Sequence, residues 1–359
     1  KITFTKLLNN IENENWKEVL VWYEKHYNAK LNSALKGLEY TNVPEKIDES
    51  LIKKLYGNNF KTNISKLESY MACPFSYYLK YGLKLSEKEK LDIKPIDTGS
   101  FMHEVIDEFF KVLAEEHKNV KEISDDEIEI IVEKIINGRM TKGGKFGLTA
   151  KYRNLVQRLK RVVTLSLKYI VESLRKSNFD VLGTEIKFDD TDDANYMPIE
   201  ITLDDGKKVS IVGKIDRVDI AKMPDGKYIR IIDYKSSTKD IDLNKFVAGL
   251  QLQLITYVDA MCKNENVNPA GALYFTLLEP KIANTKRKDL DEAKIRELIE
   301  ENYKMNGLVL ANVDVIRAMD NEIEQKSNKI PVTLNKSGEI NYSKSKTVTR
   351  EEFEKLQKY

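Results

Sequence analysis

Two strand-like runs near the middle of the chain constrain its fold more than any other feature. The run GKIDRVD occupies residues 213–219, the run IIDYKSS occupies residues 231–237, and Pro224, Asp225 and Gly226 lie between them. The runs are rich in isoleucine and valine, and Pro-Asp-Gly is turn chemistry. Because a connection this short joins strands that run in opposite directions, we expect two neighbouring antiparallel strands.

Charged side chains interrupt these otherwise apolar runs. Asp233 and Lys235 are two positions apart, so they point to the same face of their strand. Asp216 stands at a similar place in the preceding run. A buried carboxylate or ammonium is costly unless it is paired or binds a metal, and two carboxylates repel unless a divalent cation lies between them. The pattern therefore fits either a buried Asp–Lys ion pair or a site for Mg²⁺ or Mn²⁺.

Four further residues are candidates for the same site. His103 lies in a predicted helix after a Gly-Ser pair, and Glu185 lies in a strand-like segment that leads to the site. Gln253 and Tyr257 are four apart, so they share one face of a predicted helix. The ordinary alternatives are a histidine without a ligand role and a glutamine and a tyrosine that only cover the helix surface.

The spacing of apolar residues changes near residue 179. Before that point apolar residues three and four apart predict helices, with a capping box formed by Ser65 and Glu68. After it, period-two runs and turn residues predict strands. We expect helices at about 100–117, 125–137 and 150–176, strands between 179 and 236, a helix near 243–264, a strand at 271–278, helices over 290–326, a weak hairpin near 330–342 and a final helix from residue 349.

These elements suggest three regions. Residues 1–61 form a helical N-terminal extension that looks like the tail of a preceding domain, and residues 62–285 form the core. Residues 286–359 form a C-terminal extension of helices and a hairpin. We expect this extension to be truncated, because its last predicted helix reaches the final residue without a C-cap.

Charge is segregated along the chain although its total is nearly balanced. Lysine and arginine number 59 and aspartate and glutamate 57, yet residues 137–176 hold eleven basic residues and a single acid, Glu172. On a helix, this stretch gives an apolar face and a basic face. Most charged faces are simply solvated, but a face with so little compensating acid also suits a phosphate backbone. The candidate DNA-binding residues are Arg153, Arg158, Lys160, Arg161 and Lys168.

The order of the motifs resembles a known family. The series G-S-x-x-H, G-x-E, G-K-I-D-R, D-Y-K and Q-x-x-x-Y is similar to the RecB-type nuclease module of the PD-(D/E)XK superfamily. The segments SKLESYMACPFSYYLKYGLKL, GLQLQLITYVDA and GALYF further resemble the C-terminal nuclease region of the AddB subunits of AddAB helicase–nucleases. The resemblance covers about residues 50–280. It implies an α/β fold, a restriction-endonuclease-like core with a small mixed β-sheet flanked by helices, plus helical extensions.

The resemblance also implies roles for the candidate residues. His103, Asp216 and Asp233 would bind the metal, Mg²⁺ or Mn²⁺, with the carbonyl of Tyr234 as a further ligand. Water would then attack a DNA phosphodiester and leave a 5′-phosphate. The remaining implied roles are those of the catalytic lysine, Lys235, of two substrate-orienting residues, Gln253 and Tyr257, and of a supporting acid, Glu185.

Further properties of the family concern an iron–sulfur cluster and a partner. Cys73 matches the first of four ligands of a 4Fe–4S cluster, but Cys262 matches none of the other three, so we expect the cluster only in a full-length protein. The family implies a heterodimer with an AddA-like helicase–nuclease subunit that processes double-strand breaks for recombination, with this module degrading the 5′-ended strand. Residues 138–145 resemble a phosphate-binding loop but have Gly144 where the motif needs lysine, so we find no ATP site.

The composition excludes several other classes of protein. The longest apolar run falls short of the roughly 18 residues that a membrane-spanning helix needs, and two cysteines cannot build a disulfide framework. We therefore expect a cytoplasmic protein without a membrane. The competing functions are a stand-alone RecB-like or Cas4-like exonuclease, a DNA-binding scaffold of the same fold without activity, and a structural subunit for partner docking.

Overall fold

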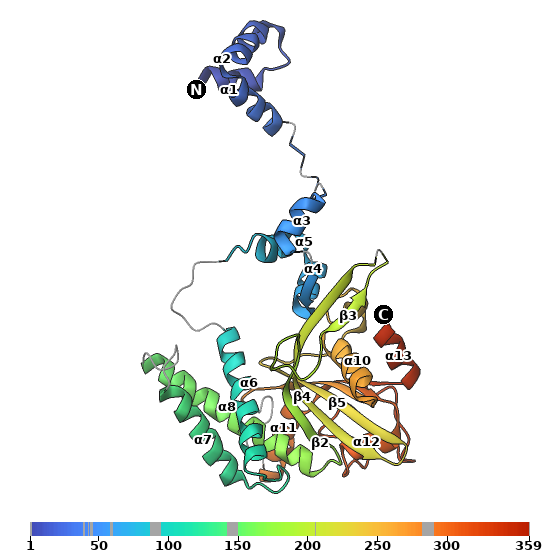
Figure 1. Ribbon diagram of the computed structural model, residues 1–359. Helices are drawn as coiled ribbons and strands as arrows, with labels where there is room; N and C mark the ends of the chain where they lie inside the picture. Colours follow the sequence, from blue (N-terminus) through green and yellow to red (C-terminus); the bar gives the residue numbers. More distant parts are fainter. Residues whose placement is uncertain are drawn as a thin grey trace. The chain divides into compact units, whose positions relative to one another are not determined.

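The computed structural model describes residues 2–358, except residues 39, 42, 44–45, 58–59, 87–94, 142–149, 205 and 282–290 (Figure 1). The second half of the glycine-rich run at 138–145 therefore lies outside the described residues. The chain divides into two compact units, Lys1–Leu55 and Tyr56–Tyr359. The boundary between them falls at residue 55, whereas the sequence suggested residue 61.

The first unit is a small helical body. Leu7 and Leu31 are buried in it, and the rings of Phe4 and Tyr23 lie 5.0 Å apart. It contains α1 (Ile2–Asn9), the short 3₁₀ helix η1 (Glu14–Trp16) and α2 (Lys17–Leu38), and α3 (Glu49–Tyr56) runs across the boundary.

Helices dominate the first part of the second unit, as the sequence predicts. The capping-box prediction is wrong, because α4 (Ile64–Ala72) begins one residue before Ser65 and its N-cap is Asn63, whose side chain accepts from the Lys66 backbone N–H at 2.9 Å. Glu68 is thereby free of that local role. The other helices are α5 (Pro74–Tyr77), the π-helical turn η2 (Tyr78–Gly82), α6 (Pro95–Glu115), α7 (Asp125–Thr141) and α8 (Ala150–Arg175), of which α6, α7 and α8 pack together (Figure 1).

The strands form one mixed sheet, which confirms the predicted fold class. Its order is β1-β4-β5-β6-β7-β8, and β2 and β3 also pair with β4. The pairs β1–β4, β5–β6 and β7–β8 are parallel and the other pairs antiparallel. The strands are β1 (Phe60–Asn63), β2 (Asp180–Phe188), β3 (Ile199–Thr202), β4 (Lys208–Met223), β5 (Gly226–Lys235), β6 (Asn268–Thr276), β7 (Asn306–Leu310) and β8 (Thr347–Val348).

The long strand β4 organises the sheet. Its first residues pair with β1 and β3, and its later residues pair with β2 and β5. The predicted antiparallel hairpin is confirmed: the β4–β5 ladder runs from Met223 opposite Gly226 to Arg217 opposite Ile232. Gly226 has φ +144°, a value that favours glycine at the turn. Because this ladder ends at Arg217, residues 213–216 of β4 have no partner on β5.

The C-terminal third differs from the prediction in two places. The single helix expected near 243–264 is two helices, α9 (Leu243–Val247) and α10 (Gln253–Glu265). The helices expected through 290–326 are interrupted by β7, a short apolar run that pairs with β6 and so completes hydrogen bonds that a helix would satisfy internally. The expected hairpin near 330–342 is reduced to isolated bridges, and the remaining helices are α11 (Glu292–Tyr303), α12 (Val313–Met319) and α13 (Arg350–Lys358).

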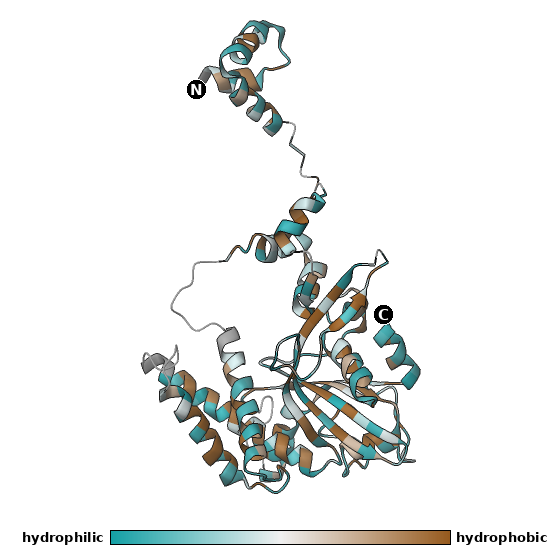
Figure 2. Ribbon diagram, in the orientation of Figure 1, coloured by the Kyte–Doolittle hydropathy of each residue, from teal (hydrophilic) through white to brown (hydrophobic). Residues whose placement is uncertain are grey.

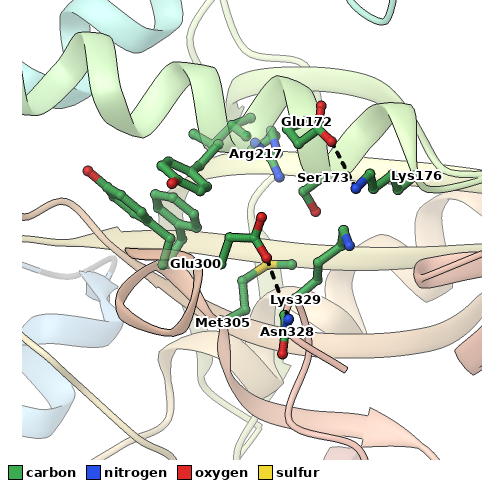
Figure 3. Close-up of a pocket in the computed structure, with 12 residues that line it drawn as sticks. Glu172, Ser173, Lys176, Arg217, Glu300, Met305, Asn328 and Lys329 are labelled. Atoms are coloured by element: carbon green, nitrogen blue, oxygen red, sulfur yellow. Dashed lines mark hydrogen bonds and ion pairs between the residues drawn. The ribbon is translucent and has the colours of Figure 1, made fainter. Parts of the chain in front are cut away.

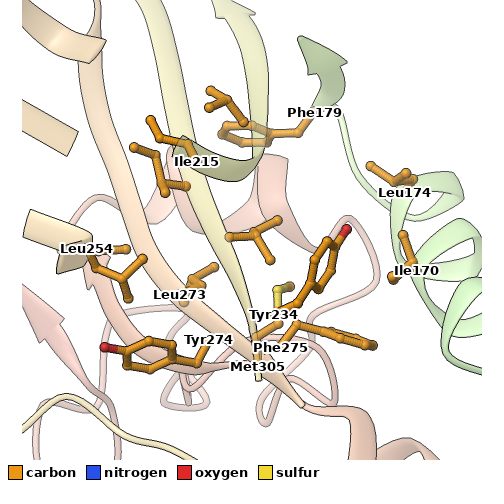
Figure 4. Packing of buried hydrophobic residues seen from close by; sticks show 14 of the residues in the cluster. Ile170, Leu174, Phe179, Ile215, Tyr234, Leu254, Leu273, Tyr274, Phe275 and Met305 are labelled. Atoms are coloured by element: carbon orange, nitrogen blue, oxygen red, sulfur yellow. The ribbon is translucent and has the colours of Figure 1, made fainter. Parts of the chain in front are cut away.

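The hydrophobic core lies on both sides of the sheet. Figure 4 shows Ile170 and Leu174 of α8 on one side of the strands and Leu254 of α10 on the other, each at most 1% exposed. The apolar faces of the helices turn toward this core (Figure 2). Full burial of such a side chain stabilises the fold by roughly 1.5–3 kcal/mol. Packing on both faces therefore holds in place the strands β4 and β5, which carry the charged residues. Among the described residues, no helix is long and apolar enough to cross a membrane.

Candidate metal centre

Asp216 lies where β4 and β5 separate. Its side chain is 9% exposed, and one carboxylate oxygen, Oδ2, accepts a hydrogen bond from the backbone N–H of Tyr234 at 2.7 Å. Because the β4–β5 ladder has ended one residue earlier, this N–H bonds to the side chain rather than to the backbone of β4. The other oxygen, Oδ1, lies 3.3 Å from His103 Nδ1 on α6. The carboxylate is thus fixed from two directions.

Glu185 faces Asp216 from the neighbouring strand. In the β2–β4 register, Thr184 is opposite Arg217 and Ile186 opposite Ile215, so Glu185 is opposite Asp216. Glu185 adopts φ +52°, a left-handed conformation that is unfavourable for a residue with a side chain. Residues held in such conformations concentrate at functional sites, where the surrounding structure over-determines them.

Ligand atoms of His103, Glu185 and Asp216 all lie within 4.8 Å of one another. Two carboxylates and one imidazole at this separation form a donor set for a divalent cation, and hard oxygen donors favour Mg²⁺ or Mn²⁺. The three residues come from α6, β2 and β4, elements that pack around the buried core. The chemistry of these donors therefore fits the metal that the sequence predicts.

The protonation equilibria of the site reflect crowded negative charge. Burial raises the pKa of Glu185, and the ion pair with Lys214 offsets part of that rise. Burial and the nearby Asp216 carboxylate raise the pKa of Asp233 to about 6. Burial alone would lower the pKa of His103, but hydrogen bonding to Asp216 and the surrounding carboxylates raise it. Each shift has the direction expected where a cation would be stabilising.

Asp233 and Lys235 occupy a different position from the three-residue group. The Lys235 Nζ lies 2.5 Å from Asp233 Oδ2, so the ion pair that the sequence offered as an alternative is present. Among the described residues, the clustered donor atoms include Glu185 and not Asp233. The ligand roles of Asp233 and of the Tyr234 carbonyl stay predictions. Glu185, expected only to support the site, has a carboxylate oxygen within the three-residue group.

Gln253 and Tyr257 are brought to the same place by α10. The side-chain oxygen of Gln253 lies 3.4 Å from Lys235 Nζ. Tyr257 packs over Gly213, where an added Cβ would come within 2.8 Å of the tyrosine ring, so only glycine leaves room for this approach. Burial raises the pKa of Tyr257 to about 12, although hydrogen bonding from the Lys214 backbone and from Gln253 opposes the rise.

Lys214 is a residue that the sequence analysis missed. Its ammonium pairs with Glu185, and burial, which would lower its pKa, is outweighed by the carboxylates around it, so the pKa is raised. The signal was available in the sequence. Lys214 is two residues before Asp216 on the same strand, and side chains two apart share a face.

The basic face of α8 is narrower than its sequence predicts. Lys168 lies 2.6 Å from Glu129 and Lys160 lies 3.3 Å from Glu133, both on α7. The expectation of an almost uncompensated face was wrong for these two lysines, because α7, which precedes α8 in the chain, packs against α8 and brings Glu129 and Glu133 to them. The remaining residues of the face, each of them exposed, are Arg153, Arg158 and Arg161.

Arg158 and Arg161 lie near the same acid, Glu279, and Arg158 borders a groove. Each guanidinium Nε lies 3.8 Å from an oxygen of Glu279. Arg158 also lines a groove together with Ser236, the residue that follows Lys235 in the chain. The other lining residues are Thr98, Met102, Leu155, Leu159, Val162, Leu277, Leu278, Glu279, Pro280 and Lys281. The groove therefore joins the basic face to the end of β5, where Lys235 lies.

A second cavity, shown in Figure 3, lies beside Arg217, which points to the opposite face of β4 from Asp216. Its cations are already paired: Lys176 lies 3.0 Å from Glu172, and Lys329 lies 3.4 Å from Asp320. Among its described lining residues, no group of clustered acidic ligands is found.

The comparisons with known proteins concern the family of the chain. A family model described as the PD-(D/E)XK nuclease superfamily matches residues 61–345. The chain is 38% identical over 375 residues to a protein of Clostridium novyi (strain NT) that is named as a subunit of an ATP-dependent helicase/deoxyribonuclease. That match covers 99% of this chain and 32% of the relative.

Two further relatives are named as the same helicase/deoxyribonuclease subunit. The relative from Caldanaerobacter subterraneus subsp. tengcongensis is 37% identical over 355 residues, and the one from Acetivibrio thermocellus is 37% identical over 354 residues. In both cases the match covers 96% of this chain and 30% of the relative. The chain thus spans about a third of the length of the curated relatives it matches. With the predicted motifs on one mixed sheet and on the helices α6 and α10, and with the family model matching most of its length, the chain belongs to the PD-(D/E)XK nuclease superfamily.

Proposed function

We propose that this chain is the metal-dependent DNA-hydrolysing module of a helicase–nuclease subunit. The observation that carries the proposal is the convergence of His103, Glu185 and Asp216, whose ligand atoms lie within 4.8 Å of one another, beside the Asp233–Lys235 pair. The named relatives are helicase/deoxyribonuclease subunits, which supports DNA as the substrate.

The reaction would be hydrolysis of a phosphodiester. A bound Mg²⁺ or Mn²⁺ would supply Lewis-acid stabilisation of the phosphoryl oxygens and a more acidic water. An O–P bond would form between the water oxygen and phosphorus as the water loses a proton to solvent, and the bond from phosphorus to the 3′ oxygen would break as that oxygen takes up a proton from solvent. The products would be a 5′-phosphate and a 3′-hydroxyl.

The protein's own groups divide the remaining work. His103, Glu185 and Asp216 would hold the metal, and Asp233 would add a carboxylate at the same edge. Lys235, 25% exposed and held by Asp233, would place a positive charge beside the phosphoryl group as negative charge develops there.

The α10 residues would fix this arrangement. Gln253 contacts Lys235 and would limit the directions in which its ammonium points. Tyr257, packed on Gly213, would bound the same site. Both would thereby orient the substrate relative to Lys235.

The DNA strand would lie in the groove that joins Arg158 to Ser236. Arg153, Arg158 and Arg161 would contact its phosphates, whereas Lys160 and Lys168 are engaged by α7. Association of basic side chains with phosphates releases counterions and makes binding depend on salt.

The wider setting is also part of the proposal. The relatives are each named as one subunit of a larger enzyme, which implies a partner, and an AddA-like helicase–nuclease subunit would supply ATP-driven unwinding in a cytoplasmic complex that acts on double-strand breaks. The module would degrade the 5′-ended strand. Cys73 and Cys262, both free thiols, cannot by themselves supply the four ligands of a 4Fe–4S cluster, so such a cluster would need cysteines beyond these two.

The test is cleavage of end-labelled single-stranded DNA with and without Mg²⁺ or Mn²⁺. We expect cleavage only with metal, and loss of at least about 10³-fold in Asp216→Ala, since loss of several kcal/mol of charge stabilisation has that effect on rate. DNA binding should persist in this variant. Equal rates in the variant and the parent would reject the proposal, and metal-independent DNA binding without cleavage in the parent would favour the inactive scaffold.

A further inference from the structure

The helix α10, which carries Gln253 and Tyr257, begins without a local cap. Its first amide groups need acceptors outside the helix, and Leu252, the residue that precedes it, has no side chain that can accept. The acceptor comes instead from α4. The Glu68 Oε1 accepts from the backbone N–H of Leu252 at 2.8 Å and from that of Gln253 at 3.3 Å. A carboxylate at a helix N-terminus is also favoured by the helix dipole.

Glu68 is well placed to act as a fixed anchor. It is half-buried, and α4 is held at its start by the Asn63 cap and by Ile64, which is 2% exposed. α4 directly follows β1, and it contacts both β1 and β4. The anchor for α10 is thereby tied to the strand that carries Asp216.

The anchored end of α10 is the end that reaches Lys235. Glu68 holds the backbone of Gln253, and the side chain of Gln253 lies 3.4 Å from Lys235 Nζ. Tyr257 follows one turn later and packs over Gly213. A displacement of the first turn of α10 would therefore move both residues relative to Lys235.

We propose that Glu68 is a positioning residue for DNA cleavage, which acts by holding the start of α10 so that Gln253 stays against Lys235. This inference rests on the proposed function. It concerns no contact of Glu68 with metal or DNA. Its effect should fall on the rate of the chemical step and not on the binding of either.

The experiment measures single-turnover cleavage of labelled single-stranded DNA by the full chain with saturating Mn²⁺. In Glu68→Ala we expect a rate about 10- to 100-fold lower, the range typical for loss of a residue that orients a catalytic group. The dissociation constants for DNA and for Mn²⁺ should be unchanged. Glu68→Gln keeps an acceptor oxygen and should recover most of the rate.

The matched control is Glu127→Ala. Glu127 is also a carboxylate at a helix start, where it accepts from the Ser124 backbone N–H at 3.0 Å, but α7 carries none of the site residues. Its loss should leave the cleavage rate at the parent value. The inference would be overturned if Glu68→Ala cleaved DNA as fast as Glu127→Ala. It would also be overturned if Glu68→Ala lowered the rate of Gln253→Ala by the same factor by which it lowers the rate of the parent.

Two more variants keep the outcome clear. If Glu68→Ala does not fold, Glu68→Asp withdraws the carboxylate by one methylene and should show the same loss of rate, and a parental rate there would overturn the inference. Asp216→Ala distinguishes the two proposals. If it cleaves DNA at the parental rate, the proposed function itself fails, whereas an inactive Asp216→Ala beside a fully active Glu68→Ala rejects only the role of Glu68.

Discussion

Two charged clusters lie next to each other along β4, and they differ in which sign of charge is in excess. In the first, Asp219 lies between two arginines, 3.0 Å from Arg217 Nε and 2.9 Å from Arg230 Nε, and all three side chains are at most 2% exposed. Arg217 also donates to the hydroxyl of Tyr234 at 3.0 Å. Cations outnumber acids here, and one aspartate is the shared counterion of two arginines.

In the second cluster the acids outnumber the lysines, and the carboxylates lie close to one another. Glu185 and Asp216 face each other across two strands, with His103 as the third donor, and Asp233 is close enough for the Asp216 charge to raise its pKa. Lys214 and Lys235 each engage one acid at the rim of the group. Buried charge alone therefore does not mark a functional site, whereas carboxylates that the fold holds close together form a donor set for a cation.

The largest effect on stability should come from removing Asp219 from the first cluster. Asp219→Ala leaves Arg217 and Arg230 buried without their shared counterion, and loss of one partner of a buried ion pair costs about 3–5 kcal/mol. We expect the free energy of unfolding, measured with urea, to fall by that amount.

The matched change in the other cluster is Asp216→Asn. It keeps an acceptor for the Tyr234 N–H and removes one of several like charges, so we expect a change of less than about 1 kcal/mol in the same measurement. Cleavage should nevertheless be lost. Equal destabilisation in the two variants would show that the clusters are not distinct.

The next effect is stabilisation of the second cluster by metal. Binding of Mn²⁺ to the folded state alone should stabilise the protein by about 2.7 kcal/mol at a concentration 100 times the dissociation constant. Thermal unfolding with and without Mn²⁺ measures this shift. Asp216→Asn should abolish it, whereas Asp219 lies outside the site and makes no such contribution.

The same measurement separates two ligand sets. The structure groups Glu185 with His103 and Asp216, and the family resemblance adds Asp233. If Glu185 is a ligand, Glu185→Gln removes most of the shift caused by Mn²⁺. A full shift in this variant would restrict Glu185 to a supporting role.

The sequence was sufficient for the parts of this site that lie on regular strands. Period-two spacing placed Asp233 and Lys235 on one face, and the short turn predicted the antiparallel neighbour that carries Asp216, both as found. It could not show that Glu185 faces Asp216, because cross-strand register between β2 and β4 depends on their packing. For the same reason the sequence could not show the hydrogen bonds of Glu68, whose partners are 184 and 185 residues away.

The acidic and basic stretches around α7 and α8 show a related limit. The sequence shows which residues are charged, but the pairing of Lys160 with Glu133 and of Lys168 with Glu129 depends on how the two helices pack. Likewise the prediction of a helix at β7 was wrong, because a run of five residues such as NGLVL is too short for its spacing of apolar residues to distinguish a strand from a helix.

The smallest predicted effect extends the comparison to the surface of α8, where some cations are held in close ion pairs and others are more exposed. Arg158 and Arg161 share one distant acid, Glu279, whereas Lys160 is paired with Glu133 on α7. Arg158→Gln with Arg161→Gln should weaken single-stranded DNA binding and reduce the slope of log K against log salt by about 1.4, since each phosphate contact contributes about 0.7. Lys160→Gln changes charge on the same helix and should leave the slope close to the parent value, because its ammonium is held by α7 rather than by DNA. Fluorescence anisotropy over a range of salt concentrations measures both slopes. If the slope falls equally for Lys160→Gln, an ion pair at 3.3 Å does not keep this lysine from contacting DNA. The difference expected between the paired and the exposed cations of α8 would then be wrong.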